Sequence, residues 1–404
     1  MAKDGADDGL LAGTGARNQQ VKYLNLQGEF TGENRVHRPS FRGRHATFAP
    51  NGAQMMPVGA VMDYVLDGWL PEAPQIDRTT KVTAFGSCFA ANVSKWLGQR
   101  NYRVSAKDEA AQNTYVVRIG EGMANSFVLR QQFEWAWEGK VFEAPLWHGY
   151  KAKEFGYDPE VQAQTKALFD QTDVFILTLG LSEVWYDEVT GGVFWRTVPR
   201  DAYDPERHKF RVASVEENRE NLEAIYQLIR THRPDAKVIF TLSPIPLLAT
   251  FRGEACMTAN SVSKASLRCA VDDVARKYKD EGHLFYWPSY EIVTDVFGSP
   301  FLPDRRHLPE DVLSFIMMQF EEAWCHDEGD RAPLLEQWVL ALTASGHLPP
   351  RTKGIVENRK KLGVRRLIEK GIKDDNVEYR EAKKALLAAL LESWDLDTAS
   401  VAAE

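Results

Sequence analysis

The sequence has little cysteine and no long apolar run. Four cysteines in 404 residues, with no two at Cys-x-x-Cys spacing, exclude a disulfide framework and a cysteine zinc site. No apolar run approaches the roughly 20 residues of a membrane-spanning helix. The first 20 residues lack the basic and apolar segments of a secretory signal peptide. We therefore expect a protein without a membrane span that works in the cytoplasm.

Basic residues are not in excess either. The chain has 49 Lys and Arg against 57 Asp and Glu, a formal net charge of −8, which argues against nucleic acid as a partner. The nine histidines show no metal-ligand spacing, and no P-loop or Gly-x-Gly-x-x-Gly motif occurs, so we expect no metal ion and no resident cofactor. A hydrophobic content of 44% with 26% charged residues is that of a globular chain and excludes a disordered one.

From residue 81 onward, short apolar runs alternate with amphipathic helical stretches. The runs are 81–85, 102–106, 173–180, 237–244 and 283–289. This alternation predicts an α/β fold, a flavodoxin-like three-layer sandwich of about five parallel strands with helices on both faces. The long stretch 107–172 exceeds one crossover helix, so we expect it to be an insertion that helps to build a site.

The remaining sequence divides into an arm and a tail. Residues 1–80 have weak periodicity and predict an N-terminal extension that wraps the core, with a helix near 58–70. Residues 81–330 are the predicted catalytic domain. Residues 331–404 predict a C-terminal tail of mixed-charge helices, and this tail is a candidate element for a homodimer.

A serine follows the first predicted strand directly, in Gly86-Ser87-Cys88-Phe89-Ala90. Gly86 permits a tight turn, and backbone N–H groups at a helix start can stabilise an oxyanion. Ser87 is therefore a candidate nucleophile, although a serine there can equally be a simple helix cap. Cys88 is intrinsically a better nucleophile, but at this position we expect a buried structural thiol.

Two further polar motifs follow later strands. In Asp304-Arg305-Arg306-His307, the carboxylate can hold imidazole Nδ1–H and leave Nε2 as a base. In Gly180-Leu181-Ser182-Glu183, a backbone or side-chain donor could face the same sheet edge. Taken singly, each motif can also be an ordinary turn, but their combination in one sheet is harder to explain by chance.

The sequence resembles the GSCFA family, within the SGNH (GDSL-like) hydrolase superfamily, over roughly residues 80–325. The resemblance rests on segments that include FGSCFA (85–90), LTLGLSEVW (177–185), SPIPLLAT (243–250) and DRRHLPE (304–310).

The resemblance implies a role for each matching residue. It implies that Ser87 is the nucleophile and that Asp304 and His307 complete a triad. It places Ser87, Gly180 and Ser182 at the oxyanion hole, with Ser182 standing where the superfamily has an asparagine of longer reach. The separate oxyanion glycine of the superfamily has three candidates in RIGEGMANS, namely Gly120, Gly122 and Asn125.

Five residues are candidates for binding substrate. Lys264 and Arg268 lie one helical turn apart and could reach the mouth of the site together, to hold a phosphate or carboxylate. Arg118 is a similar candidate. Glu183 and Trp185 follow the third strand, where an indole could stack on a sugar. A solvated basic face and ordinary aromatic packing are the alternatives.

The leading hypothesis is a serine-dependent acyl-ester enzyme, an O-acetylesterase or O-acyltransferase. Its expected substrate is a small-molecule or glycan ester, and the resemblance implies a bacterial carbohydrate or polysaccharide precursor. One alternative is a sugar acetyltransferase that takes acyl-CoA as donor. The other is a non-catalytic glycan-binding protein that keeps the fold, which the serine at position 182 motivates.

Overall fold

The computed structural model describes residues 47, 49–119, 122–297, 300–326 and 331–401. The chain divides into two compact units. One is Gly68–Asp330, and the other comprises the described residues of Met1–Asp67 and Arg331–Glu404. All the candidate site residues that the structure describes belong to the Gly68–Asp330 unit.

Four parallel strands form the central sheet of the Gly68–Asp330 unit. They are β1 (Val82–Gly86), β2 (Val174–Leu179), β5 (Lys237–Leu242) and β6 (Leu284–Trp287), in the order β1-β2-β5-β6. Every residue of β2 is buried, as a strand covered on both faces should be. Because the strands are parallel, their carboxyl ends meet at one edge of the sheet. This architecture is consistent with a flavodoxin-like fold.

The run 102–106, predicted as a strand, does not join the sheet as one. Only Val104 forms a single bridge, to Val82, and the chain then enters the 3₁₀ helix η3 (Ser105–Lys107). The Ser105 hydroxyl shares a 2.7 Å hydrogen bond with Thr83 of β1, which holds the turned chain there. The prediction of about five strands was therefore one too many.

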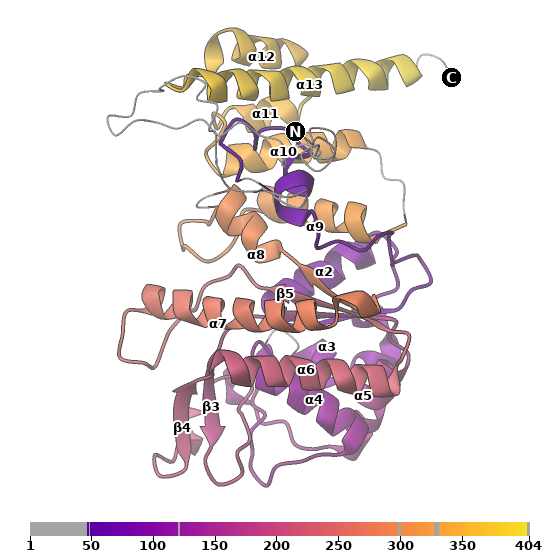
Figure 1. The fold of residues 1–404 in the computed structure, drawn as a ribbon, viewed down its shortest axis with the longest axis vertical. Helices are drawn as coiled ribbons and strands as arrows, with labels where there is room; N and C mark the ends of the chain where they lie inside the picture. The colour runs from indigo at the N-terminus through magenta and orange to yellow at the C-terminus, as the bar shows by residue number, and fades with distance from the viewer. Residues whose placement is uncertain (1–46, 48, 120–121, 298–299, 327–330, 402–404) are drawn as a thin grey trace, which may run out of the picture. The chain divides into compact units, whose positions relative to one another are not determined.

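Helices cover both faces of this sheet (Figure 1). One face carries α2 (Cys88–Gln99) and α9 (Glu310–Trp324), and Phe320 and Trp324 of α9 contact aromatic rings of β6. The other face carries α4 (Ser126–Glu138), α5 (Pro159–Asp170), α6 (Val215–His232) and α7 (Cys256–Lys277). Helices on both faces therefore give three layers, as the alternation of strands and helices predicts.

The insertion contributes several elements rather than one crossover helix. Besides α4 and α5 it contains α3 (Tyr115–Arg118), η4 (Glu109–Ala111) and η6 (Tyr150–Ala152). The other short helices of the unit are η7 (Arg200–Ala202), η8 (Lys279–Glu281), α8 (Ser289–Glu291) and η9 (Ile292–Val296).

A second, two-stranded sheet follows directly after β2, and the sequence patterns did not predict it. It pairs β3 (Glu183–Asp187) with β4 (His208–Val212) in antiparallel register. The Asp187 carboxylate is completely buried and accepts hydrogen bonds from Arg207. This hairpin starts at the carboxyl edge of the main sheet and carries two of the candidate residues, Glu183 and Trp185.

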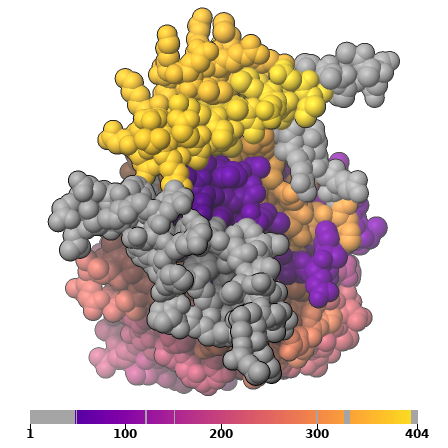
Figure 2. All heavy atoms as spheres, turned by 45° about the horizontal axis from the view of Figure 1, so that its top comes forward, coloured from indigo at the N-terminus to yellow at the C-terminus, as the bar shows by residue number. Residues whose placement is uncertain are grey.

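The second unit is helical. It contains η2 (Met62–Leu66), α10 (Arg331–Ala344), α11 (Thr352–Val356), α12 (Lys361–Arg366), η10 (Leu367–Gly371) and α13 (Val377–Val401). The buried indole N–H of Trp338 donates to the Met56 carbonyl oxygen at 2.7 Å. In Figure 2 the indigo N-terminal segment borders the yellow C-terminal helices. The helix predicted near 58–70 is the shorter η2, and residues 1–46 of the predicted arm lie outside the described residues.

Candidate active site

Ser87 occupies the turn from β1 into α2, and Gly86 makes this turn possible. Gly86 has φ +131°, and a Cβ atom there would lie 2.1 Å from the Thr178 carbonyl oxygen. No other residue type fits that position without moving β2. Ser87 is only 5% exposed, and its Oγ accepts a hydrogen bond from the Phe89 amide at 3.3 Å, so it caps α2. Ser87 Oγ also shares a 2.9 Å hydrogen bond with Thr178 Oγ1.

The two backbone amides predicted as oxyanion donors are already bonded. The Ser87 amide donates to the carbonyl oxygen and to Oγ1 of Thr178, at 3.0 and 2.6 Å. The Gly180 amide donates to the Ala124 carbonyl oxygen at 2.7 Å. Gly180 nevertheless lies beside the serine, since a Cβ atom at Gly180 would be 3.7 Å from Ser87 Cβ. Ser87 and Gly180 are therefore close together, as expected, but neither backbone N–H points into an open oxyanion hole.

Ser182 is not an oxyanion donor in this structure. It is completely buried, and its hydroxyl donates to the Ser263 carbonyl oxygen at 2.9 Å while its amide donates to Ser263 Oγ at 2.7 Å. The Asn218 side-chain amide also donates to Ser182 Oγ, at 3.4 Å. The Ser182 hydroxyl therefore connects α7 and α6 to the end of β2, and it does not point toward a substrate.

Asn125 provides a different side-chain amide near the same turn. It caps α4 by accepting the Val128 amide on Oδ1 at 3.0 Å, and the residue is 4% exposed. Across the described ranges, its Nδ2 has no hydrogen-bond partner. The preceding residue, Ala124, holds the Gly180 amide, so Asn125 lies next to the turn that touches Ser87.

Gly122 provides no such group. The Gly122 amide donates to the Ile119 carbonyl oxygen at 2.8 Å, and Gly122 packs against Arg196. Gly120 lies outside the described residues. Of the two described candidates, Gly122 and Asn125, only Asn125 thus has a donor without a hydrogen-bond partner among the described residues.

Asp304 and His307 form the hydrogen bond that their spacing suggests. Asp304 Oδ2 lies 2.5 Å from His307 Nδ1, and Oδ1 accepts the amides of Arg306 and His307, each at 3.0 Å. The His307 hydrogen bond, followed by these amides, lowers the pKa of the Asp304 carboxyl to about 2. The carboxylate therefore stays charged at neutral pH and can fix the imidazole tautomer.

The Asp304–His307 pair does not touch Ser87. No hydrogen bond joins Ser87 to His307 among the residues that the structure describes, and the His307 side chain is 62% exposed. The Arg306 guanidinium donates to the Pro246 carbonyl oxygen at 3.4 Å, in the loop that follows β5. The pair is thus held at the carboxyl edge of the sheet, the edge where Ser87 follows β1.

Lys264 and Arg268 do not reach the mouth of a site together, contrary to expectation. Lys264 is 1% exposed, and its Nζ donates to the carbonyl oxygens of Gly180 and Ser243 at 2.6 and 2.7 Å. Burial lowers the pKa of the Lys264 amine to about 7, and an electrostatic interaction with Cys88 opposes this shift. Because the Lys264 amine is buried and bonded to the residues that follow β2 and β5, it cannot hold a substrate phosphate.

Arg268 belongs to a separate ion-pair network. Its Nε donates to Glu291 at 2.6 Å, and Nη1 lies 3.4 Å from Asp272. The guanidinium also lies over the rings of Tyr286 and Trp69, at 4.5 and 4.9 Å. Its charge is already matched by these carboxylates, and its partners differ from those of Lys264.

Glu183 and Trp185 lie on β3 beside the loop that follows β5. The Thr250 hydroxyl donates to Glu183 at 2.8 Å, and burial raises the pKa of the Glu183 carboxyl against this hydrogen bond. The Trp185 indole contacts the rings of Phe210 and Phe251, with centroids 5.5 and 5.1 Å away. The buried Nε1 of Trp185 has no hydrogen-bond partner within the part of the chain that the structure describes. Both residues therefore stay candidates for contacting a substrate.

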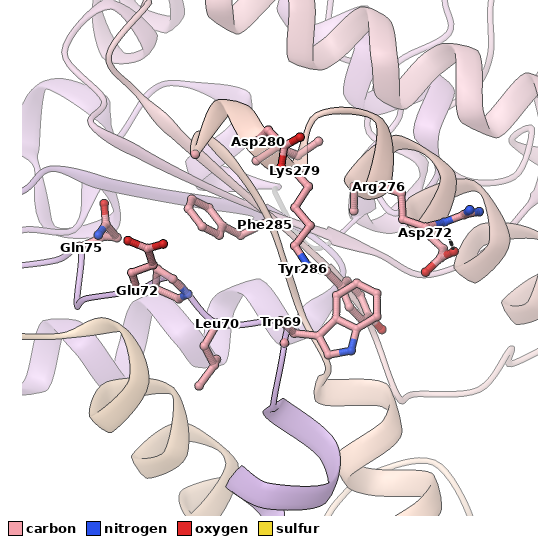
Figure 3. A pocket seen from close by; sticks show the side chains of 15 residues that line it. Trp69, Leu70, Glu72, Gln75, Asp272, Arg276, Lys279, Asp280, Phe285 and Tyr286 are labelled. Carbon is pink, nitrogen blue, oxygen red and sulfur yellow. Dashed lines mark hydrogen bonds and ion pairs between the residues drawn. The ribbon is translucent and has the colours of Figure 1, made fainter. Parts of the chain in front are cut away.

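A cavity of about 700 Å³ adjoins Arg268, since Trp69, Asp272 and Tyr286, which Arg268 contacts, are among its lining residues (Figure 3). It is formed by the end of α7, the start of β6 and the segment 68–75, and none of the predicted site residues lines it. Lys279 extends toward Trp69 and Tyr286, and Arg276 pairs with Asp272 at 2.7 Å. Its wall carries charges of both signs, so its charge does not point to one class of ligand.

The described residues form neither a cluster of metal ligands nor a membrane-spanning helix. In the described ranges there is no group of three or more His, Cys, Asp or Glu residues that could hold a metal ion. Likewise, none of the described helices is long and apolar enough to cross a membrane.

The fold defines an α/β protein with a parallel four-stranded sheet and helices on both faces. The model of the GSCFA family matches residues 81–320, which is more than half of the sequence, so the chain belongs to the GSCFA family. The matched region runs from β1 into α9 and includes Ser87, Asp304 and His307. No curated protein and no solved structure matches the chain significantly.

Proposed function

We propose that the protein is a serine-dependent acyl-ester enzyme of the SGNH type, either an O-acetylesterase or an O-acyltransferase. Its proposed substrate is an ester of a bacterial carbohydrate or polysaccharide precursor. The main support is that Ser87 occupies a glycine-enforced turn at the same sheet edge as a hydrogen-bonded Asp304–His307 pair. Serine catalysis needs these three groups within reach of one another.

The proposed reaction has two acyl-transfer steps. Ser87 Oγ attacks the ester carbonyl carbon while His307 Nε2 takes the hydroxyl proton, with Asp304 stabilising the imidazolium. His307 returns this proton to the departing alcohol, which leaves an acyl-serine. Water or a sugar hydroxyl then attacks the acyl-serine, His307 takes the proton of the attacking group, and Ser87 regains it.

The oxyanion needs a donor that the bonded amides of Ser87 and Gly180 do not supply. Asn125 Nδ2 meets this need in the proposal, because it has no hydrogen-bond partner among the described residues and adjoins the Gly180 turn. An oxyanion donor commonly contributes 10²- to 10³-fold to the rate. The proposal further requires the exposed turn that carries His307 to move onto Ser87, since contacts of this kind often tighten only when substrate binds.

A non-catalytic glycan-binding protein is the second candidate. It is favoured by one observation, namely that Ser87 Oγ is hydrogen-bonded to Thr178 and the Phe89 amide rather than to His307. In that case Ser87 would act only as the cap of α2. A third candidate, the acyl-CoA-dependent sugar acetyltransferase, depends on whether the chain binds a phosphorylated donor.

Turnover of p-nitrophenyl acetate by the wild type and by Ser87→Ala tests the proposal. We expect the substitution to lower kcat/KM at least about a thousandfold. Ser266→Ala is the matched control, since the Ser266 hydroxyl donates only to the Val262 carbonyl oxygen of its own helix, α7. Equal turnover by wild type and Ser87→Ala would rule out Ser87 as the nucleophile. Loss of turnover in Cys88→Ala alone would transfer the role to the thiol.

A further inference from the structure

A cavity of about 410 Å³ beside α2 carries charge of one sign only. Lys95, Lys107 and Arg118 line it, and no aspartate or glutamate is among its lining residues. Three cations without a carboxylate are unusual in a chain whose net charge is −8. Such a concentration of positive potential in a concave surface attracts anions.

The cations of this cavity differ from most others in the unit by lacking acidic partners. Lys81, Arg207 and Arg268, for example, each form an ion pair. In the described part of the chain, neither Lys95 nor Arg118 forms an ion pair. Lys107 donates to the carbonyl oxygen of Gly98 in the last turn of α2, which leaves its charge unneutralised.

The cavity reaches the neighbourhood of Ser87. Its apolar wall includes Phe85, two residues before the serine, and Ala90, whose amide donates to the Ser87 carbonyl oxygen at 3.0 Å. Arg118 also lines an adjoining cavity of about 440 Å³, together with Lys153. The Arg118 Cζ and the Lys153 Nζ lie 5.5 and 5.4 Å from the centre of the Phe155 ring. This second cavity is also lined by Glu154 and Asp158, so the lining without carboxylates is confined to the cavity beside α2.

We propose that the cavity lined by Lys95, Lys107 and Arg118 binds the phosphate groups of a phosphorylated ligand of the enzyme. Cations that can donate several hydrogen bonds suit phosphate oxygens, and the apolar wall suits the uncharged part of the ligand. This inference rests on the proposed function for the role of the ligand. A phosphorylated acyl donor such as acetyl-CoA and a phosphorylated sugar acceptor share the chemistry that the cavity recognises.

Calorimetric titration of Ser87→Ala with acetyl-CoA, UDP-glucose and inorganic pyrophosphate tests the proposal without turnover. We expect at least one of these probes to bind, and raising the salt concentration to weaken it. Lys95→Gln and Arg118→Gln, each added to Ser87→Ala, should weaken binding about tenfold. Lys166→Gln is the control, because Lys166 is an exposed lysine that pairs with Asp170 elsewhere on the unit. Lys107 is left intact because it caps Gly98.

The outcomes separate this inference from the proposed function. Binding of acetyl-CoA alone identifies the ligand as a donor, and binding of UDP-glucose alone identifies it as an acceptor. Failure of all three probes to bind, or binding that Lys95→Gln and Arg118→Gln leave unchanged, would overturn the phosphate site. If the probes bind as expected but Ser87→Ala retains full esterase turnover, the site stands and the serine mechanism fails.

Discussion

Replacing the buried Lys264 by methionine should change how stability depends on pH. The amine of Lys264 is 1% exposed and donates to two carbonyl oxygens, Gly180 O and Ser243 O. A neutral amine has two N–H groups and can keep both bonds, so nothing in the site requires the charge. Burial without a carboxylate partner accordingly holds the pKa at about 7 instead of its ordinary 10.5.

The sign of the effect follows from proton binding in the two states. Between pH 7 and 10.5 the unfolded chain keeps the Lys264 proton and the folded protein has released it. The free energy of unfolding therefore rises with pH in this window, by at most about 1.4 kcal/mol per pH unit. Below pH 7 both states are protonated, and this contribution to the slope vanishes. From pH 6 to pH 9, the wild type should gain about 2.5 kcal/mol relative to Lys264→Met.

Urea unfolding followed by tryptophan fluorescence at pH 6, 7, 8 and 9 measures this difference, and the 11 tryptophans provide the signal. Groups that titrate alike in both proteins cancel when the two curves are subtracted. Lys166→Met is the control, because the Lys166 side chain is 49% exposed and its difference from wild type should not vary over this range. Parallel curves for wild type and Lys264→Met would refute the reasoning, since Lys264 would then stay charged in the folded protein.

Three further substitutions test the geometry of the site. Gly86→Ala should destabilise the protein by about 3 kcal/mol in urea unfolding, because the new Cβ atom would meet the Thr178 carbonyl oxygen; unchanged stability would contradict the tight turn. Asp304→Asn should lower esterase kcat by 10²- to 10⁴-fold while leaving stability nearly unchanged, because the amide no longer fixes the His307 tautomer; undiminished kcat would remove Asp304 from the mechanism. Asn125→Asp keeps an oxygen to cap α4 but removes the Nδ2 donor, so kcat should fall about a hundredfold with little change in KM; a fall in stability alone would make Asn125 only a cap.

The sequence predicted the sheet where periodicity and burial agree. The runs that became β1, β2, β5 and β6 are apolar and buried on both faces, so neighbouring helices had to cover them. The run 102–106 does alternate between buried and more exposed residues, since Tyr102 and Val104 are buried. Its pairing with β1 nevertheless ends after one bridge. What stops it is the turn at Ser105, fixed by a hydrogen bond to a residue 22 positions earlier in the chain. Such a long-range contact leaves no local pattern.

Contacts between candidate site residues could be predicted where short sequence spacing determines them. They could not be predicted where the burial of a side chain determines its role. The turn at Gly86 and the Asp304–His307 contact both follow from short spacing, and both are present. Lys264 and Arg268 could not be assigned in this way, because helical spacing alone does not tell a solvated face from a buried one. The Asn125 amide, which has no partner among the described residues, was harder to identify, because its segment offered three candidates and nothing in the sequence favoured one of them.

The bonded amide of Gly180 and the open amide of Asn125 are consequences of one arrangement. The Gly180 N–H is occupied because it donates to the Ala124 carbonyl oxygen, and this bond anchors the start of α4 at the strand end. Freeing the Gly180 amide would therefore release the segment that brings Asn125 to the turn. With a side-chain donor held there, a second donor at position 182 is unnecessary, and the Ser182 hydroxyl can serve to fasten α7. If Asn125 supplies the oxyanion donor, as we propose, then the serine at 182 is compatible with catalysis, because the donor that it does not provide comes from another element of the fold.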